Sequence, residues 1–503
     1  MGTTVTGRGD GPDPSHVLAV LDAAGLHVAA PAVSTATFLD TFDGLLHRAG
    51  LRLTHRDGVL VLDGSGAVAA QLPSASPPRF AADLPPGPFR ARLSDVVEVR
   101  ALLPVLSLTS TSRRAVRRNR DGKVVAVADI HDALATEHGP LGGWFVEVVE
   151  LTGYEKQAAE LGDLVRANGV TEIDADLVAT AMAAAGVDPA GHDSDPSIPL
   201  DPDLPALEGF RLVLAHLARS IEANLPGTID DIDPEFLHEF RVAVRRSRSV
   251  LRHGTRVLPE MAWATDGLRS LGHLTGPPRD LDVYVLEWDD YVDDLPAETV
   301  AALEPVRAQL HADRAAAHDE LAVALRAEPV TDLLARWSRW LSDPRHPAAA
   351  GPDAERPILD VVRRRIEKAQ DRLVGHGRKI TPATPAEDVH ELRKDAKKLR
   401  YLLECFGGLL PTKPRKAFVK RLKALQDNLG RHQDAEVHVA QLRQTVTELP
   451  EETPNQTFVA IGQLIEQLEQ IRQDARDEFA ERFADYDAEA THRALRALLD
   501  GAD

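Results

Sequence analysis

The second half of the chain contains the same sequence pattern twice, and this duplication restricts the fold more than any other feature. Leu237–Gly254 aligns with Val389–Phe406 at an offset of 152 residues, and Leu268–Val285 aligns with Leu422–Val439 at an offset of 154. Apolar residues recur at helical spacing in both blocks, with few β-branched alternations. A repeat of about 150 residues with this pattern predicts two copies of one helical bundle.

The first part of the chain has a different pattern, so we expect separate domains. Gly, Pro and Asp punctuate short β-like runs there, at Thr35–Leu39, Gly58–Leu62, Ala67–Leu72, Val97–Leu108, Val124–Ala128 and Trp144–Leu151. Helices are expected at Ser15–Ala24, Glu155–Asn168 and in the Ala-rich run Leu177–Val187, after a disordered tail that contains Arg8-Gly9-Asp10. We therefore predict an α+β domain over 1–187, a Pro/Asp-rich linker over 188–205 and an all-α domain over 206–503. The Pro/Gly-rich break His346–Pro357 separates the two helical copies, at about 206–345 and 356–500.

Charge and cysteine content exclude several classes of protein. A formal net charge of −20 over 503 residues argues against a protein that coats DNA through an excess of Lys and Arg. The single cysteine, Cys405, excludes an internal disulfide framework and a Cys-rich zinc module, and we expect it to be packed in a helix. No run approaches the ~18 apolar residues of a membrane span, and the N-terminus lacks a signal-peptide pattern. These features predict a cytoplasmic protein without a membrane partner.

A row of cations follows one face of each duplicated helix. At ~100° per residue, the first row falls within an arc of about 80°. It consists of His238, Arg241, Arg245, Arg248 and Arg252, and the second copy repeats it with His390, Arg393, Lys397 and Arg400. The first row is ~21 Å long at 1.5 Å per residue, which suits an extended anion better than one phosphate. A solvated helix face, bridged to acids on neighbouring helices, is the alternative interpretation.

Further residues are assigned around these rows. Other basic side chains that could join the site are Arg246, Arg279, Lys394, Lys398, Lys420, Lys423 and Arg431. Asp280 and Asp434 follow glycine bends, so we expect them to start the next helix and to orient arginines by pairing. Arg stands three residues after each histidine, so neither a metal site nor a cofactor is predicted. The histidines would instead contact a phosphate oxygen, or would cap a helix or edge the core.

The duplicated blocks closely resemble the CHAD family, named for a conserved-histidine α-helical domain. The residues that carry the resemblance are His238–Arg246 and Arg279–Val283 with their second-copy counterparts, and it covers about Pro205–Leu499. It implies two helical bundles related by a pseudo-twofold axis, with a basic central groove that binds inorganic polyphosphate. Association with polyphosphate granules follows as a further expectation. The binders carried over by motif are His238, Arg241, Arg245, Arg246, Arg252, His390, Arg393, Lys397 and Arg400.

The first domain is similar, over less sequence, to the CYTH or triphosphate-tunnel fold, which often precedes CHAD domains. The similar residues are Phe38–Asp43, His47–Leu53, Arg113–Arg120 and Trp144–Leu151. The Glu-x-Glu-x-Lys signature of that family is absent, and Glu147 and Glu150 fall on opposite strand faces. The resemblance therefore implies a degenerate antiparallel β-tunnel without catalytic residues. The arginines of Arg113–Arg120 could bind anions or edge a loop, and both interpretations stay open.

Two alternatives to polyphosphate binding are kept. The first is a Mg²⁺-dependent triphosphatase or polyphosphatase of the CYTH type, which the missing signature disfavours. The second is binding of nucleic acid or phosphoprotein in the same groove, which an aromatic content of 5% disfavours because few side chains could stack on bases. The sequence sets neither a chain-length preference nor an oligomeric state.

Overall fold

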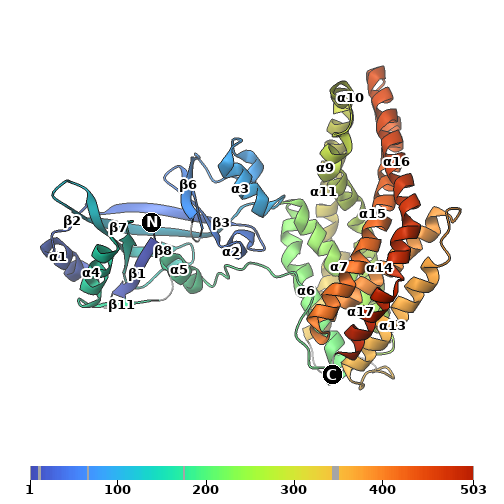
Figure 1. Ribbon diagram of the computed structural model, residues 1–503, viewed down its shortest axis with the longest axis horizontal. Coiled ribbons are helices and arrows are strands. Elements are labelled where there is room, and N and C mark those ends of the chain that lie inside the picture. The colour runs from blue at the N-terminus through green and yellow to red at the C-terminus, as the bar shows by residue number, and fades with distance from the viewer. Residues whose placement is uncertain (1, 10–12, 65–66, 174–175, 343–349, 502–503) are drawn as a thin grey trace. The chain divides into compact units, whose positions relative to one another are not determined.

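The chain divides into two compact units, Met1–Asp193 and Ser194–Asp503. The computed structural model describes residues 2–9, 13–64, 67–173, 176–342 and 350–501 (Figure 1). Part of the expected break between the helical copies, His346–Pro357, lies outside these ranges. None of the helices within them is both long enough and apolar enough to cross a bilayer.

Unit 1 is built on an antiparallel sheet with the order β11-β1-β10-β8-β7-β3-β4-β5-β6, with β2 added to β7 and β9 to β8. The strands are β1 (Gly2–Gly9), β2 (His27–Val28), β3 (Ala32–Asp40), β4 (Leu51–Arg56), β5 (Val59–Gly64), β6 (Ala67–Pro73), β7 (Leu103–Arg118), β8 (Val124–Thr136), β9 (Gly139–Pro140), β10 (Phe145–Glu150) and β11 (Val170–Glu172). Over the described residues the end strands β11 and β6 do not pair. The predicted α+β class is confirmed, but the sheet is open and not a closed tunnel.

The helices of unit 1 are α1 (Ser15–Ala23), α2 (Leu45–Arg48), α3 (Pro88–Val97), α4 (Glu155–Arg166) and α5 (Leu177–Ala185), with a 3₁₀ turn at Ala81–Asp83. Valine and leucine side chains of α1 and α4 pack against the sheet beside Val146 of β10. The helices predicted near residues 15, 155 and 177 are therefore confirmed, each within three residues at its ends.

Two local predictions in this unit are wrong. The run from Val97 to Leu108 is not one strand, because Pro88 starts a helix that buries Phe89, Leu93 and Val97, and β7 begins only at Leu103. The tail is not disordered, since β1 pairs with both β10 and β11. In the first part of the expected linker, the His192 amide donates to the Phe42 carbonyl at 2.9 Å and the two rings lie 5.3 Å apart.

Unit 2 is helical, and its two copies present their helices in the same order. The first copy has α6 (Ala206–Ile229), α7 (Pro234–His253), α8 (Ala262–Leu274), α9 (Gly276–Val292), α10 (Ala297–Ala302), α11 (Glu304–Arg326) and α12 (Glu328–Ser342). The second has α13 (Ile358–Gly377), α14 (Ala386–Cys405), α15 (Thr412–Glu448), α16 (Asn455–Tyr486) and α17 (Glu489–Asp500), with a 3₁₀ turn at Gly407–Leu409. Both α7 and α14 contain 20 residues, and their bounds differ by 386 − 234 = 152.

One difference between the copies lies at the glycine bend. Prolines at 277 and 278 lack an amide donor, so the first copy is divided there into α8 and α9, whereas the second copy runs on as the single helix α15. Asp280 therefore lies near the start of α9, as expected. Asp434 lies in the interior of α15, so the expectation that it starts a helix is wrong.

The two copies meet through equivalent residues. Pro205 and Pro357, which immediately precede α6 and α13, form an isolated antiparallel bridge. The Ala206 amide donates to the Arg356 carbonyl at 2.9 Å, and the Ile358 amide donates to the Leu204 carbonyl at 2.8 Å. Each member of these bonds is 152 residues from its counterpart, so the contact is reciprocal, as around a local twofold axis.

Both copies contribute to one apolar core. It includes Phe210 and Phe240 from the first copy and Phe406 and Phe418 from the second, and the rings of Phe210 and Phe406 lie 4.9 Å apart. A separate cluster joins the outer parts of α9 and α11 to α15 and α16, which run side by side in Figure 1. Cys405 lies in the main core, as expected, and burial raises the pKa of its thiol to about 12.

Two glycines of α13 provide a test of this packing. A Cβ at Gly377 would lie 2.0 Å from the Phe483 ring of α16, whereas a Cβ at Gly375 would meet nothing within 4 Å. Gly377→Ala should therefore lower the free energy of unfolding by about 1–3 kcal/mol, and Gly375→Ala should raise it by about 0.5–1 kcal/mol. Urea unfolding followed by circular dichroism measures both, and equal effects of the two substitutions would contradict the packing described.

Candidate functional site

The cationic rows of α7 and α14 are positioned by the opposite faces of the same helices. Asp233 caps α7 by accepting from the amides of Glu235 (2.9 Å) and Phe236 (3.3 Å), and Pro234 occupies the first turn. Phe236, Leu237, Phe240, Val244 and Leu251 are buried on α7, as are Leu392, Ala396, Leu399 and Leu403 on α14. Because these faces enter the shared core, α7 and α14 pack together and present their cations to a common space.

Two cavities lie along this contact. The first has a volume of about 610 Å³ and the second about 410 Å³. The first is lined by Arg245, Arg248, Ser249, Arg252, His273, His390, Glu391, Lys394, Lys397, Lys398 and Tyr401. The second is lined by His238, Arg241, Val242, Arg245, Arg279, Asp280, Val283, Glu287, His390, Arg393, Lys397, Gln433, Asp434, Val437 and His438. Arg245, His390 and Lys397 line both, so we treat the two cavities as one groove.

Four cations in the groove form no ion pair. Within the ranges that the structure describes, no hydrogen bond or ion pair is formed by the side chains of Arg245, Arg248, Arg252 and Lys397. Burial, together with Arg393 and Arg245, lowers the pKa of Lys397 to about 7. Burial and the neighbouring Arg252 lower the pKa of Arg248. Arg245 and Lys397 are equivalent residues, so the two copies bring their central cations together.

Other predicted residues in the groove are held by local partners. Arg241 is 6% exposed, and its Nη1 donates to Thr275 Oγ1 at 3.0 Å and to the Gly272 carbonyl at 3.3 Å. Burial and Arg245 lower its pKa to about 10. In the second copy, the equivalent Arg393 donates to Asp434 at 3.0 Å. This contact agrees with the pairing expected for Asp434.

The remaining groove residues are also fixed by hydrogen bonds. Arg279 donates to the Pro234 carbonyl at 3.0 Å, and His390 Nδ1 lies 2.5 Å from Gln433 Oε1. Lys394 and Lys398 line the first cavity but pair with acids of their own helix, Glu391 and Asp395, each at 2.7 Å. These side chains form fixed walls around the unpaired cations.

Five predicted residues do not line either cavity. Arg246 and Arg400 both contact Glu404, at 2.9 and 2.5 Å. Arg246 thereby links α7 to α14, and Arg400 links two successive turns of α14. Arg431 pairs with Glu478 of α16 at 2.6 Å. Lys420 and Lys423 are exposed on α15. The sequence could not separate these residues from the groove, because helical periodicity does not show which acids neighbouring helices supply.

The sequence interpretation also missed several lining residues. Tyr401 and Ser249 are equivalent positions, one turn beyond Lys397 and Arg245, and could have been found by extending the cationic rows. His273, Glu287 and His438 come from α8, α9 and α15, and no local pattern marks them. His438 is buried against Tyr284, with stacked ring centroids 4.4 Å apart, and burial lowers its pKa to about 4.

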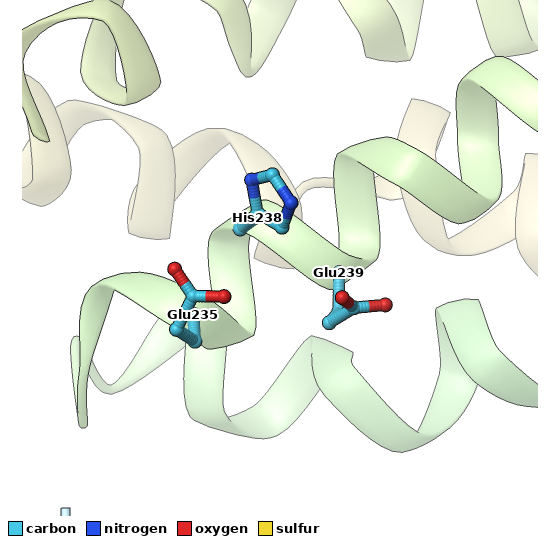
Figure 2. A group of neighbouring side chains, drawn as sticks. All are labelled: Glu235, His238 and Glu239. Atoms are coloured by element: carbon cyan, nitrogen blue, oxygen red, sulfur yellow. The ribbon is translucent and has the colours of Figure 1, made fainter. Parts of the chain in front are cut away.

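One histidine and two glutamates cluster at the edge of the second cavity. Single ligand atoms of Glu235, His238 and Glu239 all lie within 4.8 Å of one another, and Figure 2 shows the three side chains on the first turns of α7. The sequence interpretation considered only the positions three and four residues after the histidine. It did not consider the acids that lie three residues before the histidine and one residue after it.

The arginines predicted in unit 1 are mostly engaged by acids of the same unit. Arg114 forms a bidentate pair with Asp129 at 2.8 and 2.7 Å, and Arg113 pairs with Asp132. Glu147 lies 3.4 Å from His131 on the neighbouring strand β8. Arg117 lies 3.9 Å from Glu160, whereas Arg118 donates to the Gly122 carbonyl, so acids compensate only part of this arginine run.

Comparison with known protein families gives a match inside unit 2. The CHAD domain family model matches residues 212–443. Two uncharacterized proteins of Mycobacterium tuberculosis, MT2285 of strain CDC 1551 and Rv2226 of strain H37Rv, are 28% identical over 293 residues, which is 55% of this chain and 55% of each protein. The chain thus spans about half the length of the curated relatives it matches.

Two solved structures are also similar to this chain, each with a TM-score below 0.5. The CHAD domain from the plant Ricinus communis is 26% identical, with a TM-score of 0.47 over 60% of this chain and 95% of that chain. PptA from Streptomyces chartreusis is 19% identical, with a TM-score of 0.44 over 56% of this chain and 99% of that chain.

Neighbouring arginines of α7 test the distinction between paired and unpaired cations. Arg246→Met leaves Glu404, whose side chain is 16% exposed, with one cation fewer, and should lower the free energy of unfolding by about 1–3 kcal/mol. Arg245→Met removes an exposed cation from a cluster of like charges. It should change the free energy of unfolding by less than about 0.5 kcal/mol. Urea unfolding compares the two, and a larger loss for Arg245→Met would contradict the assignment.

Proposed function

We propose that this chain, whose helical unit contains a CHAD domain, binds inorganic polyphosphate in the groove between α7 and α14. The observation that carries the proposal is the set of unpaired cations Arg245, Arg248, Arg252 and Lys397, which line one cavity and oppose each other's charge. A polyanion between them would relieve this repulsion and would receive charge-assisted hydrogen bonds. Binding breaks no bond, so the proposal assigns no catalytic residue.

The shape of the groove favours an extended anion over a single phosphate. The two cavities share Arg245, His390 and Lys397, so one chain of phosphates could pass from the first cavity to the second. Arg248 and Arg252 would hold it on the first-cavity side, and Arg241 and Arg393 on the other. Such a ligand would make several ionic contacts, so its affinity should fall steeply with salt.

The lining favours phosphates over nucleic-acid bases. Tyr401 is the one Phe, Tyr or Trp among the described residues that line the groove. Proteins that bind single strands without sequence preference combine cations with several aromatic stacking platforms. The same chemistry supports an association with polyphosphate granules, which are a large source of this ligand.

Two double substitutions with equal charge change test the site. Arg245→Ala with Lys397→Ala removes both shared cations, and at about 1.5 kcal/mol or more per charged hydrogen bond the affinity should fall at least about a hundredfold. Lys420→Ala with Lys423→Ala removes two exposed charges outside the groove and should change affinity by less than about threefold. Isothermal titration calorimetry with polyphosphate measures both, and equal losses would place the binding surface elsewhere.

The pKa of Lys397 predicts a linkage between polyphosphate and proton binding. A nearby phosphate raises this pKa from about 7 in the free protein, so binding at pH 8 should take up nearly one proton per site. Lys397 contributes fully to the free energy of polyphosphate binding below pH 7. This contribution declines as the pH rises toward the pKa that Lys397 has in the complex. Calorimetry in buffers of different ionisation enthalpy measures the uptake. Lys397→Arg should keep the charge and abolish the uptake, and unchanged uptake in that variant would refute the linkage.

A further inference from the structure

We propose that the groove binds the end of a polyphosphate chain and holds its terminal phosphate in the second cavity. This inference rests on the proposed function and adds which part of the polymer is recognised. The two cavities differ in their acids. Glu391 is the one acid among the described residues that line the first cavity, and it accepts from Lys394 at 2.7 Å. Asp280, Glu287 and Asp434 line the second cavity.

The acids of the second cavity come from other helices than its central cations. Asp280 and Glu287 lie on α9 and Asp434 lies on α15, whereas α7 and α14 supply the central cations. Among the described residues, Asp280 and Glu287 form no ion pair. Desolvation raises the pKa of Asp280 against the effect of two arginines of α7, and Asp434 raises it further. Desolvation and Asp434 also raise the pKa of Glu287. This cavity therefore disfavours additional negative charge.

Internal and terminal phosphates differ in how they meet such a cavity. An internal phosphate of the chain carries one negative charge and no proton near neutral pH. A terminal phosphate has a second ionisable oxygen, whose pKa is about 6 in a phosphate monoester. It can therefore keep a proton beside a carboxylate and donate a short O–H···O⁻ hydrogen bond to it. A chain that ends here meets the acids with a donor, whereas a chain that continues through the cavity meets them with like charge.

A buried histidine without a partner also indicates a ligand in this cavity. His438 is 3% exposed and lines the second cavity, and its Nδ1 has no hydrogen-bond partner among the described residues. The ring is fixed by stacking on Tyr284 and by an edge contact with Tyr291, whose centroid lies 5.0 Å away. Because burial lowers its pKa to about 4, the imidazole is neutral at pH 7 and can accept from the O–H of a terminal phosphate. Unpaired buried polar atoms in native proteins indicate a missing ligand or water.

The cations of the second cavity bind the other oxygens of the terminal phosphate. Arg241 and Arg393 line this cavity, and local hydrogen bonds fix both side chains. From there the chain passes between Arg245 and Lys397 into the first cavity, whose lining is more basic. The groove therefore has a direction. Its acid-bearing side takes the chain end, and its basic side takes the internal phosphates that follow.

The number of proteins bound per chain tests the proposal. Analytical ultracentrifugation measures it for the whole protein in excess over linear polyphosphates of two defined lengths, in the presence of EDTA, with the longer chain long enough to hold many proteins. Since a linear chain has two ends, at most two proteins should bind at either length. A number that rises with chain length would overturn end recognition and leave the proposed function standing. No binding at either length would refute both.

Blocking the chain ends tests the terminal phosphate directly. Conversion of both terminal phosphates to phosphoramidates with a small amine removes the second ionisable oxygen. This change should lower the affinity of wild type at least about tenfold in calorimetry, because the donor to the acids is lost. Equal affinities for free and blocked chains would overturn the proposal.

Matched substitutions on α9 test the role of the acids. Asp280→Asn with Glu287→Gln should reduce the difference in affinity between free and blocked chains to about threefold or less. Asp289→Asn with Asp290→Asn makes the same charge change at exposed positions outside both cavities, and should keep the wild-type difference. Glu287→Gln alone replaces the first pair if that variant does not fold by circular dichroism. Equal behaviour of the two pairs would overturn the second cavity as the site of the chain end.

Discussion

The placing of the equivalent cations of α7 and α14 side by side in one partly buried groove is the constraint on which the rest of the helical unit depends. Burial first, and then the neighbouring Arg393 and Arg245, lower the pKa of Lys397 from an ordinary 10.5 to about 7, which corresponds to a penalty on the order of 5 kcal/mol for its charged form. The protein keeps Arg245 beside it in spite of this cost. On the same helices, Arg246, Lys398 and Arg400 each have an acidic partner. Ion pairs are therefore available in this fold, but Arg245, Arg248, Arg252 and Lys397 form none among the described residues.

The apolar core and the contacts between the copies hold the cations together. One cluster of buried side chains includes residues of both copies, and the reciprocal bonds around Pro205 and Pro357 join them at equivalent positions. A half-buried ionic network fixes the wall formed by α9. Arg314 of α11 donates to Asp282 of α9 at 2.7 Å and to Asp231 at 2.9 and 2.8 Å. Through these contacts, α9 is anchored beside the segment that leads into α7.

The sequence predicted those features that depend on one helix or on the repeat. The helical character of the two repeated segments, the cationic rows and the buried faces follow from periodicity, and the duplication placed Arg245 and Lys397 as equivalents. It could not predict that Arg246 faces Glu404 or that Arg431 faces Glu478, because these pairs depend on how separate helices are aligned. The strand expected at Val97 was wrong because a short apolar run fits a strand and a helix equally well, and Pro88 decided between them. The open sheet likewise depends on pairing between distant strands, which no local pattern records.

A crystal structure of the whole chain with a polyphosphate of defined length tests the central claim most directly. The account predicts a continuous chain of phosphates that passes between Arg245 and Lys397 and extends into both cavities, with Arg248 and Arg252 in contact on one side. Phosphates bound on α15 at Lys420 and Lys423, or at the arginines of β7, with an empty groove would contradict it.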